Sequence, residues 1–279
     1  MKSRIKYSYI AEGVVCIGAI AVVVFLKFFN CDIGEGGSKI AYDVSINLMA
    51  ASVLAFTFEF LGDKMVMNKD MLCEKDSVFR VDALVRPALQ RFSLLYIQLS
   101  CADFNKVKSI CDNALRSGNI IEGMPETFAI SEMVNVFMPS MFIGGSFQRP
   151  IVEEFFEQEH RIVDEFSMAL RMNEFTHFTE IKQIMADFVE CCSTILCERA
   201  IVDATRMTAG KEKLSEMITK WLKDGTVQRF YNDVMSGKRE LSGNLISDYV
   251  RLYEKMKKER EILVRYESAI HVLHEKSNN

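Results

Sequence analysis

The sequence predicts an all-α protein: an N-terminal two-helix transmembrane hairpin, then a cytosolic helical bundle that ends in a long heptad-patterned helix. Three observations predict this fold class. Two long apolar segments lie close together near the N-terminus. The remaining sequence shows no sustained alternation of apolar and polar residues and few helix breakers, with 4 Pro and 14 Gly in 279 residues. The last segment repeats apolar residues at alternating steps of four and three.

The two apolar segments are residues 10–29 and 40–61, in which 16 of 20 and 16 of 22 residues are hydrophobic. About 20 helical residues cover the roughly 30 Å hydrocarbon core of a bilayer. Backbone groups in lipid need internal hydrogen bonds, so two helices joined by a short polar turn are expected. No small-x-small cleavage site follows the first segment, which disfavours a removed signal peptide. We predict a membrane hairpin over residues 1–62 and a second domain over residues 63–279.

Basic residues flank the predicted hairpin unevenly. Lys2, Arg4 and Lys6 precede the first span, and four more basic residues follow the second span between Lys64 and Arg80. Basic residues collect on the cytoplasmic side of membrane proteins. We therefore expect a multi-pass inner-membrane protein whose N-terminus and C-terminal domain are both cytoplasmic. The reducing cytosol also favours buried thiols over disulfides for the Cys residues of the second domain.

The second domain is expected to be helical throughout. Residues 63–77 are predicted to continue the second span as a helix into the cytosol. Hydrophobic periodicity and the positions of Pro, Gly and Asp then predict further helices. The expected ranges are 78–99, 103–117, 126–138, 150–172, 174–207 as one helix or a pair, 210–223, 226–235 and a final helix.

The final helix carries a heptad seam more than four repeats long. Eight of its nine positions are apolar, and Glu259 is the exception. Such a seam packs either inside a bundle or against a second copy of the chain. We treat it as a candidate oligomerisation surface, whose apolar members are Leu245, Tyr249, Leu252, Met256, Leu263, Tyr266, Ile270 and Leu273.

Small and polar residues within the two spans form a second candidate contact surface. These are Gly18 in the first span and Asn47, Ala51 and Ala55 in the second. Such residues let helices approach closely and hydrogen-bond across the bilayer. They either hold the hairpin together or line a homo-oligomer, and both interpretations stay open. A continuous polar stripe is lacking, which disfavours a constitutive channel.

Two Glu-x2-His pairs, Glu157–His160 and Glu174–His177, have the i, i+3 spacing used by di-metal carboxylate sites in helical bundles. The pairs lie 17 residues apart on consecutive segments. Chance produces such pairs readily in an acidic chain, and solvated helix faces explain them. The sequence also lacks the Cys-x2-Cys spacing of zinc sites. We expect no metal and no cofactor, with these four residues as the alternative ligands.

The final predicted helix contains Arg265-Tyr-Glu-Ser-Ala-Ile-His271, an Arg-x5-His spacing. It resembles the Arg-x4–6-His motif that HEPN ribonucleases, an all-helical family, carry near the end of their domain. The resemblance implies a membrane-tethered ribonuclease in which His271 acts as acid or base and Arg265 stabilises phosphate charge. It covers two residues, and Tyr266 stands where that family often has a small polar residue.

A glycine-containing loop precedes the predicted helix 150–172. Gly144, Gly145, Ser146, Phe147 and Arg149 would offer free backbone N–H groups, an aromatic face and a positive charge. These features suit a phosphate or base bound at the start of the following helix. A plain turn between helices is the competing interpretation.

The remaining patterns argue against several functions. The net charge of -4 excludes a broad nucleic-acid-binding surface. The densest basic run, Lys255, Lys257, Lys258 and Arg260, is interrupted by Glu residues and is expected to be a solvated helix face. The sequence contains neither a P-loop nor a Gly-x-Ser-x-Gly nucleophile motif.

The sequence therefore favours a non-enzymatic function. We expect a self-associating receptor or membrane effector, a layout that small effectors of bacterial defence systems share in general terms. Its expected partners are the lipid bilayer, further copies of the chain and a cytosolic protein or nucleotide ligand. The alternatives are the membrane-tethered ribonuclease and a passive membrane scaffold for a protein partner.

Overall fold

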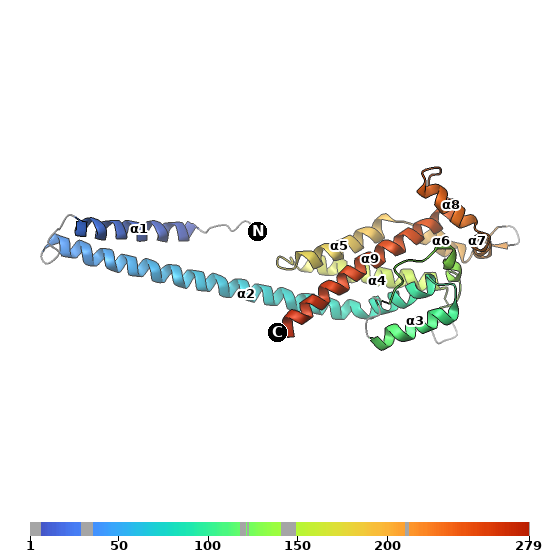
Figure 1. The fold of residues 1–279 in the computed structure, drawn as a ribbon, viewed down its shortest axis with the longest axis horizontal. Helices are drawn as coiled ribbons and strands as arrows, with labels where there is room; N and C mark the ends of the chain where they lie inside the picture. Colours follow the sequence, from blue (N-terminus) through green and yellow to red (C-terminus); the bar gives the residue numbers. More distant parts are fainter. Residues whose placement is uncertain are drawn as a thin grey trace. The chain divides into compact units, whose positions relative to one another are not determined.

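The structure, a computed structural model, describes residues 7–28, 36–117, 121, 123–140, 149–209 and 212–278. Over these residues the chain is all-α, as predicted (Figure 1). It divides into two compact units, Met1–Cys73 and Glu74–Asn279, and each is described by itself. The division falls after Cys73, inside a helix, whereas the predicted boundary follows residue 62.

The first unit contains helix α1, Tyr7–Phe28, and the start of helix α2, Gly37–Leu99. The helix continues through residues 63–77, as predicted. Among the described residues one helix, Lys39–Leu99, is long and apolar enough to cross a membrane. The other apolar stretch, Gly13–Phe25, is shorter than the about 20 residues that a span needs. The structure thus shows one such helix and does not show the predicted two-span hairpin.

The buried side chains described in the first unit are small. Ala19 of α1 and Ser45 and Ser52 of α2 are buried, and Tyr42 and Met49 are half-buried on the same stripe of α2. Steps of three and four residues place these α2 positions on one helix face. Small side chains allow helix backbones to approach closely.

The second unit begins with the last part of α2 and continues to the C-terminal helix. Its small strands β1 and β2 form a minimal antiparallel hairpin. The elements are α3 (Phe104–Ser117), η1 (Ile130–Asn135, a 3₁₀ helix), α4 (Ile151–Met172), α5 (Thr179–Thr194), α6 (Glu198–Ala204), β1 (Thr208–Ala209), β2 (Glu212–Lys213), α7 (Leu214–Lys223), α8 (Thr226–Met235) and α9 (Leu245–Asn278).

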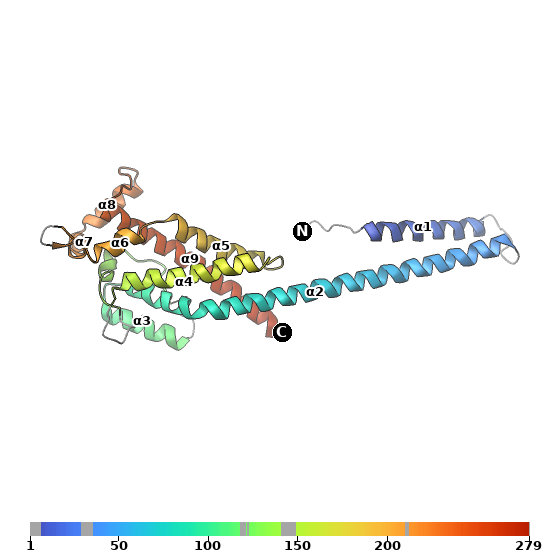
Figure 2. The same cartoon turned by 180° about the vertical axis from the view of Figure 1, so that it is seen from behind.

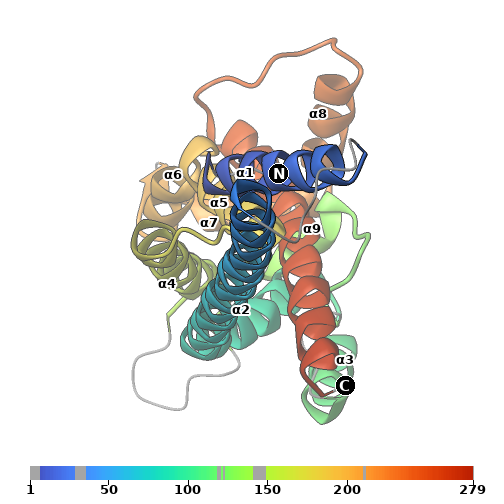
Figure 3. The ribbon, with the colours of Figure 1, turned by 90° about the vertical axis from the view of Figure 1, so that its left-hand side faces the viewer.

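Helix α5 packs against both α4 and α9, and α6 packs against the same two helices (Figure 2). The view in Figure 3 shows α4 and α9 on different sides of the unit. Aromatic side chains fill the space between the helices. Phe92 of α2 contacts Phe155 of α4, with ring centroids 4.5 Å apart. Phe166 of α4 contacts Phe188 of α5 and Tyr266 of α9. These contacts join α2, α4, α5 and α9 into one core.

The heptad seam of α9 packs inside this core. Leu245 is half-buried, and the other seven apolar members are at most 7% exposed. The seam is therefore occupied by helices of the same chain, chiefly α5 and α6. This placement corrects the expectation that the seam is an oligomerisation surface, because side chains packed in a core cannot also contact a second copy.

The helix predicted over residues 126–138 is shortened to the 3₁₀ helix η1. The backbone leaves the α-helical path at Met133, which has a non-helical ψ of 35°. Two tyrosines of α9 anchor this segment. The hydroxyl of Tyr253 donates a hydrogen bond to the carbonyl of Phe128 at 2.8 Å, and the hydroxyl of Tyr249 donates to the carbonyl of Met133.

Two other predicted ranges are interrupted. Residues 174–207 form two helices, α5 and α6, which agrees with the predicted pair. The helix predicted from residue 210 starts at Leu214 because the β1–β2 hairpin precedes it. Gly225 separates α7 from α8 with a φ of 76°, a left-handed conformation that glycine adopts without steric cost.

The burial of the seam predicts a loss of stability on truncation. Leu263→Ala removes a fully buried side chain and should lower the free energy of unfolding by about 2–5 kcal/mol. Val272→Ala, on the same helix but 47% exposed, is the matched control and should change it by about 0.5 kcal/mol or less. Chemical denaturation of the full chain in detergent, followed by tryptophan fluorescence, measures both. Equal effects would contradict internal packing of the seam.

Candidate functional site

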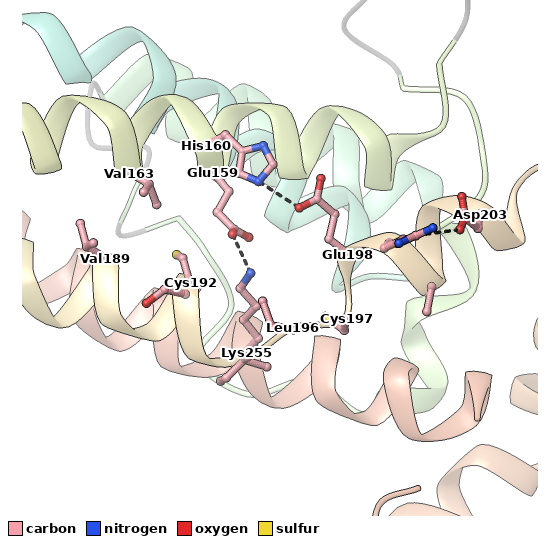
Figure 4. A pocket seen from close by; sticks show the side chains of 14 residues that line it. Glu159, His160, Val163, Val189, Cys192, Leu196, Cys197, Glu198, Asp203 and Lys255 are labelled. Atoms are coloured by element: carbon pink, nitrogen blue, oxygen red, sulfur yellow. Dashed lines mark hydrogen bonds and ion pairs between the residues drawn. The ribbon is translucent and has the colours of Figure 1, made fainter. Parts of the chain in front are cut away.

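A cavity of about 760 Å³ lies between α4, α5, α6 and α9 (Figure 4). Its wall is largely apolar, with Val163, Val189, Ile195 and Leu196 among the lining residues. Charged side chains from α4, α6 and α9 complete the wall. A concave, mainly apolar cavity with a few polar groups is the usual form of a small-molecule site.

A buried charged cluster forms one side of this cavity. The ammonium of Lys255 on α9 lies 2.6 Å from Oε1 of Glu159 on α4 and 3.9 Å from Oε1 of Glu259 on α9. The thiol of Cys192 on α5 donates a hydrogen bond to Glu259 Oε1 over 3.5 Å. Figure 4 shows Glu159 and Lys255 pointing toward each other, with Cys192 beside them. We call Glu159, Cys192, Lys255 and Glu259 the buried cluster.

Helix periodicity explains why the buried cluster is inside the unit. Glu259 occupies a position of the α9 seam, between Met256 and Leu263, so the burial of the seam takes this carboxyl into the core. Lys255 lies four residues earlier on the same face. The side chains of Lys255 and Glu259 are 2% and 0% exposed. Lys255 is therefore buried, which corrects its assignment to a solvated basic face.

Burial and neighbouring charges set the protonation of the buried cluster. Burial raises the pKa of Glu259 well above its ordinary value, and the charge of Glu159 raises it further. Burial alone would lower the pKa of Lys255, but the carboxyl groups of Glu259 and Glu159 raise it overall. Burial and the charge of Glu159 thus both favour the protonated form of Glu259, while the two carboxyl groups favour the charged form of Lys255. This arrangement limits the net charge in a site of low dielectric constant.

The thiols near the cavity are held in the protonated form. Burial raises the pKa of Cys197 and of Cys191 to about 12, and burial followed by the charge of Glu259 raises that of Cys192 further. A protonated thiol is a poor nucleophile. The arrangement therefore suits binding better than nucleophilic catalysis.

The rim of the cavity carries two close pairs of polar side chains. Nε2 of His160 lies 2.9 Å from Oε2 of Glu198, and Nε of Arg199 lies 3.8 Å from Oδ2 of Asp203. All four side chains are at least 40% exposed, so water screens these pairs and each adds little to stability.

No family model, curated protein or solved structure matches the chain. The function is therefore argued from the site itself.

The structure does not bring the Glu-x2-His residues into one site. Glu157 pairs with Arg161 at 2.7 Å, and His160 turns to Glu198 on the rim of the cavity. The backbone N–H groups of Thr176 and His177 donate to the carboxylate of Glu74 on α2, at 3.0 and 2.7 Å. Burial would raise the pKa of Glu74, but these hydrogen bonds lower it overall. Within the described residues, no group of three or more possible metal ligands contains any of the four predicted residues.

Arg265 and His271 also lie apart from the cavity. Arg265 Nη1 pairs with Oδ2 of Asp187 at 3.1 Å, and His271 Nδ1 lies 3.7 Å from Oε1 of Glu275. Six helical residues turn the chain by about 600°, so the two side chains leave α9 on different faces. Tyr266, which lies between Arg265 and His271 in the sequence, is buried. The geometry therefore gives the ribonuclease interpretation no support.

None of the other predicted positions is among the described residues that line the cavity. Gly144, Gly145, Ser146 and Phe147 lie outside the described residues, and Arg149 pairs with Glu157 at 3.0 Å. The small and polar residues predicted to form helix contacts in the first unit are exposed. These residues are Gly18, Asn47, Ala51 and Ala55. Those on α2 lie on faces other than the one that carries Ser45 and Ser52.

Sequence analysis missed the buried cluster, although part of its signal was visible. Glu259 is the one charged residue in the α9 seam, and Lys255 lies one turn before it. A charged pair on a core-facing stripe indicates a buried polar site. The partners Glu159 and Cys192 are distant in sequence, so only packing of α4 and α5 on α9 reveals them.

The buried ion pair predicts a large cost for removing one partner. Lys255→Met should lower the free energy of unfolding by about 3–5 kcal/mol, because the carboxyl of Glu159 stays buried without its counter-charge. Lys257→Met, whose side chain is 37% exposed, should cost about 1 kcal/mol or less. The measurement is denaturant unfolding of each variant.

The matched test is the double variant Lys255→Met with Glu159→Gln. It removes both members of the pair and should be more stable than Lys255→Met alone, since no uncompensated charge remains. Strict additivity of the two single changes would show that the two side chains do not interact.

Proposed function

We propose that the protein is a two-span inner-membrane receptor or effector that self-associates and senses a cytosolic ligand through residues 74–279. The observation that carries the proposal is the exposure of apolar side chains in the first unit. Val14 and Ile17 of α1 are 64% and 68% exposed, and Ile40 and Phe58 of α2 are 67% and 71% exposed. Water would solvate such a surface poorly, whereas lipid covers it without cost.

The distribution of basic residues supports a cytosolic second unit. Lys64, Lys69 and Lys75 follow the apolar part of α2, while Lys39 is the one basic residue described at its start. This asymmetry favours the cytoplasm for the side on which the second unit begins.

The cavity supports a small ligand. Its volume of about 760 Å³ lies in the range of about 300–1,000 Å³ found for small-molecule sites. The protonated thiols and the paired charges described above favour binding over catalysis. A receptor or effector, more than an enzyme, is what these features support.

Self-association is supported on α2 rather than on α9. One exposed stripe of α2 follows alternating steps of four and three residues, opposite the buried stripe that includes Ser45 and Ser52. Two of its members are Asn, which hydrogen-bond between helices and fix the register. We call this stripe the α2 seam; its residues are Asn47, Ala51, Leu54, Phe58, Leu61, Met65, Asn68 and Leu72.

The two-span topology predicts which cysteine a membrane-impermeant maleimide reaches. In intact spheroplasts the reagent should label Cys31, in the predicted turn outside the cell, and should leave Cys73 unlabelled until the membrane is permeabilised. Cys31→Ser should remove the first signal and Cys73→Ser the second. Mass spectrometry of the labelled peptides makes the measurement. Labelling of Cys73 in intact spheroplasts would exclude the proposed topology.

The α2 seam predicts which substitutions dissociate the oligomer. Met65→Glu and Leu72→Glu, both beyond the apolar span, should convert the detergent-solubilised oligomer to monomer because they place charge in the contact. Val66→Glu, equally exposed but off the seam, should not. Light scattering after size exclusion gives the mass of each. A monomeric wild-type protein, or dissociation by all three variants, would contradict the proposed seam.

A further inference from the structure

We propose that Glu159, Cys192 and Glu259 form a binding site for one divalent metal ion of the zinc type at the inner wall of the cavity. The site goes beyond the proposed membrane function and does not depend on it. It also differs from the Glu-x2-His residues that the sequence offered as metal ligands.

The donor atoms converge from three helices. One ligand atom each from Glu159 of α4, Cys192 of α5 and Glu259 of α9 lie within 4.8 Å of one another. A thiolate and carboxylates are ligands that zinc accepts in proteins, at about 2.0–2.3 Å. Donor atoms at those distances from one ion lie closer together than 4.8 Å, so binding would draw the three side chains inward.

Two oxygens of the buried cluster point to a missing ligand. Oε2 of Glu159 and Oε2 of Glu259 have no hydrogen-bond partner among the described residues, although both side chains are at least 98% buried. Buried polar atoms are nearly always satisfied; a proton on Glu259 can bond Glu159, and a bound cation would replace that proton and satisfy both carboxyls. The ammonium of Lys255 already bonds Oε1 of Glu159 and does not satisfy these two atoms.

One divalent ion would replace the protons that burial favours on Glu259 and Cys192, so its binding would leave the net charge of the buried cluster unchanged. Metal ligands bind in their deprotonated forms, so Glu159, Cys192 and Glu259 would together carry three negative charges. Lys255 contributes one positive charge beside them. The remaining two negative charges are balanced by one divalent cation, which leaves the buried site neutral. A monovalent ion would leave a net charge in the core.

The cavity gives the ion a way in. Glu159 and Cys192 both line the cavity, and the ion would enter through it. Zinc is usually four-coordinate, so three protein ligands leave one position for water or a ligand donor atom. The ion would thereby join the buried cluster to whatever occupies the cavity.

The test uses the tag-free full chain in detergent, stripped with a chelator and titrated with Zn²⁺ by calorimetry and with Co²⁺ by absorption. We expect one ion per chain, a thiolate-to-cobalt charge-transfer band and a higher melting temperature with zinc. Cys192→Ser should abolish the band and weaken zinc binding by more than about 100-fold, since even indirect partners of a metal contribute about 10–100-fold. Glu259→Gln, which keeps the side-chain shape, should weaken binding similarly.

The matched controls are Cys111→Ser, a buried thiol of α3, and Cys73→Ser, an exposed one. Both should keep the band and the affinity. The cobalt absorption spectrum of the wild-type protein tests for thiolate ligation even if a variant fails to fold. Absence of the cobalt band in the wild type, or zinc binding unchanged in Cys192→Ser, would overturn the proposal.

Discussion

The buried ion pair between Lys255 and Glu159 constrains how the helices of the second unit can pack. The pair joins α9 to α4 inside the core. The hydrogen bond from Cys192 to Glu259 joins the end of α5 to the next turn of α9. An ammonium in a low-dielectric core needs its counter-charge at short range, because desolvation costs several kcal/mol per ion. The three helices can therefore shift against one another only as far as these side chains stay in contact.

The α9 seam supplies the apolar counterpart of this constraint. Its buried side chains face α5 and α6. Tyr249 of the seam and Tyr253 of the same helix donate hydrogen bonds to the carbonyls of Met133 and Phe128. One helix thus provides the hydrophobic stripe, a charged pair and hydrogen-bond donors to a neighbouring segment. The cavity lies beside the short connection between α5 and α6. The packing of α4, α5 and α9 that buries the cluster leaves this space next to it.

The first unit distributes buried and exposed side chains differently. Small side chains are buried there and large apolar ones are exposed, the reverse of the order in the second unit. This reversal fits a solvent that is itself apolar, because helix contacts in lipid rely on close approach rather than on removal of apolar surface from water. Asn47 of the α2 seam fits the same environment, in which a polar side chain gains from a partner on another helix.

The amino-acid sequence by itself determined the all-α class, most helix boundaries and the two apolar segments, because these depend on local periodicity and on breakers such as Gly225 and Pro150. It also determined that α9 has a core-facing stripe. Only the tertiary structure decided what that stripe contacts, since a heptad pattern specifies a buried face and not its partner. Packing likewise decided that Lys255 is buried beside Glu159 and Cys192, because residues that are distant in sequence meet only through helix contacts. Packing also anchors the segment around η1, since the tyrosines that bond to its carbonyls lie on α9, more than 100 residues away in sequence.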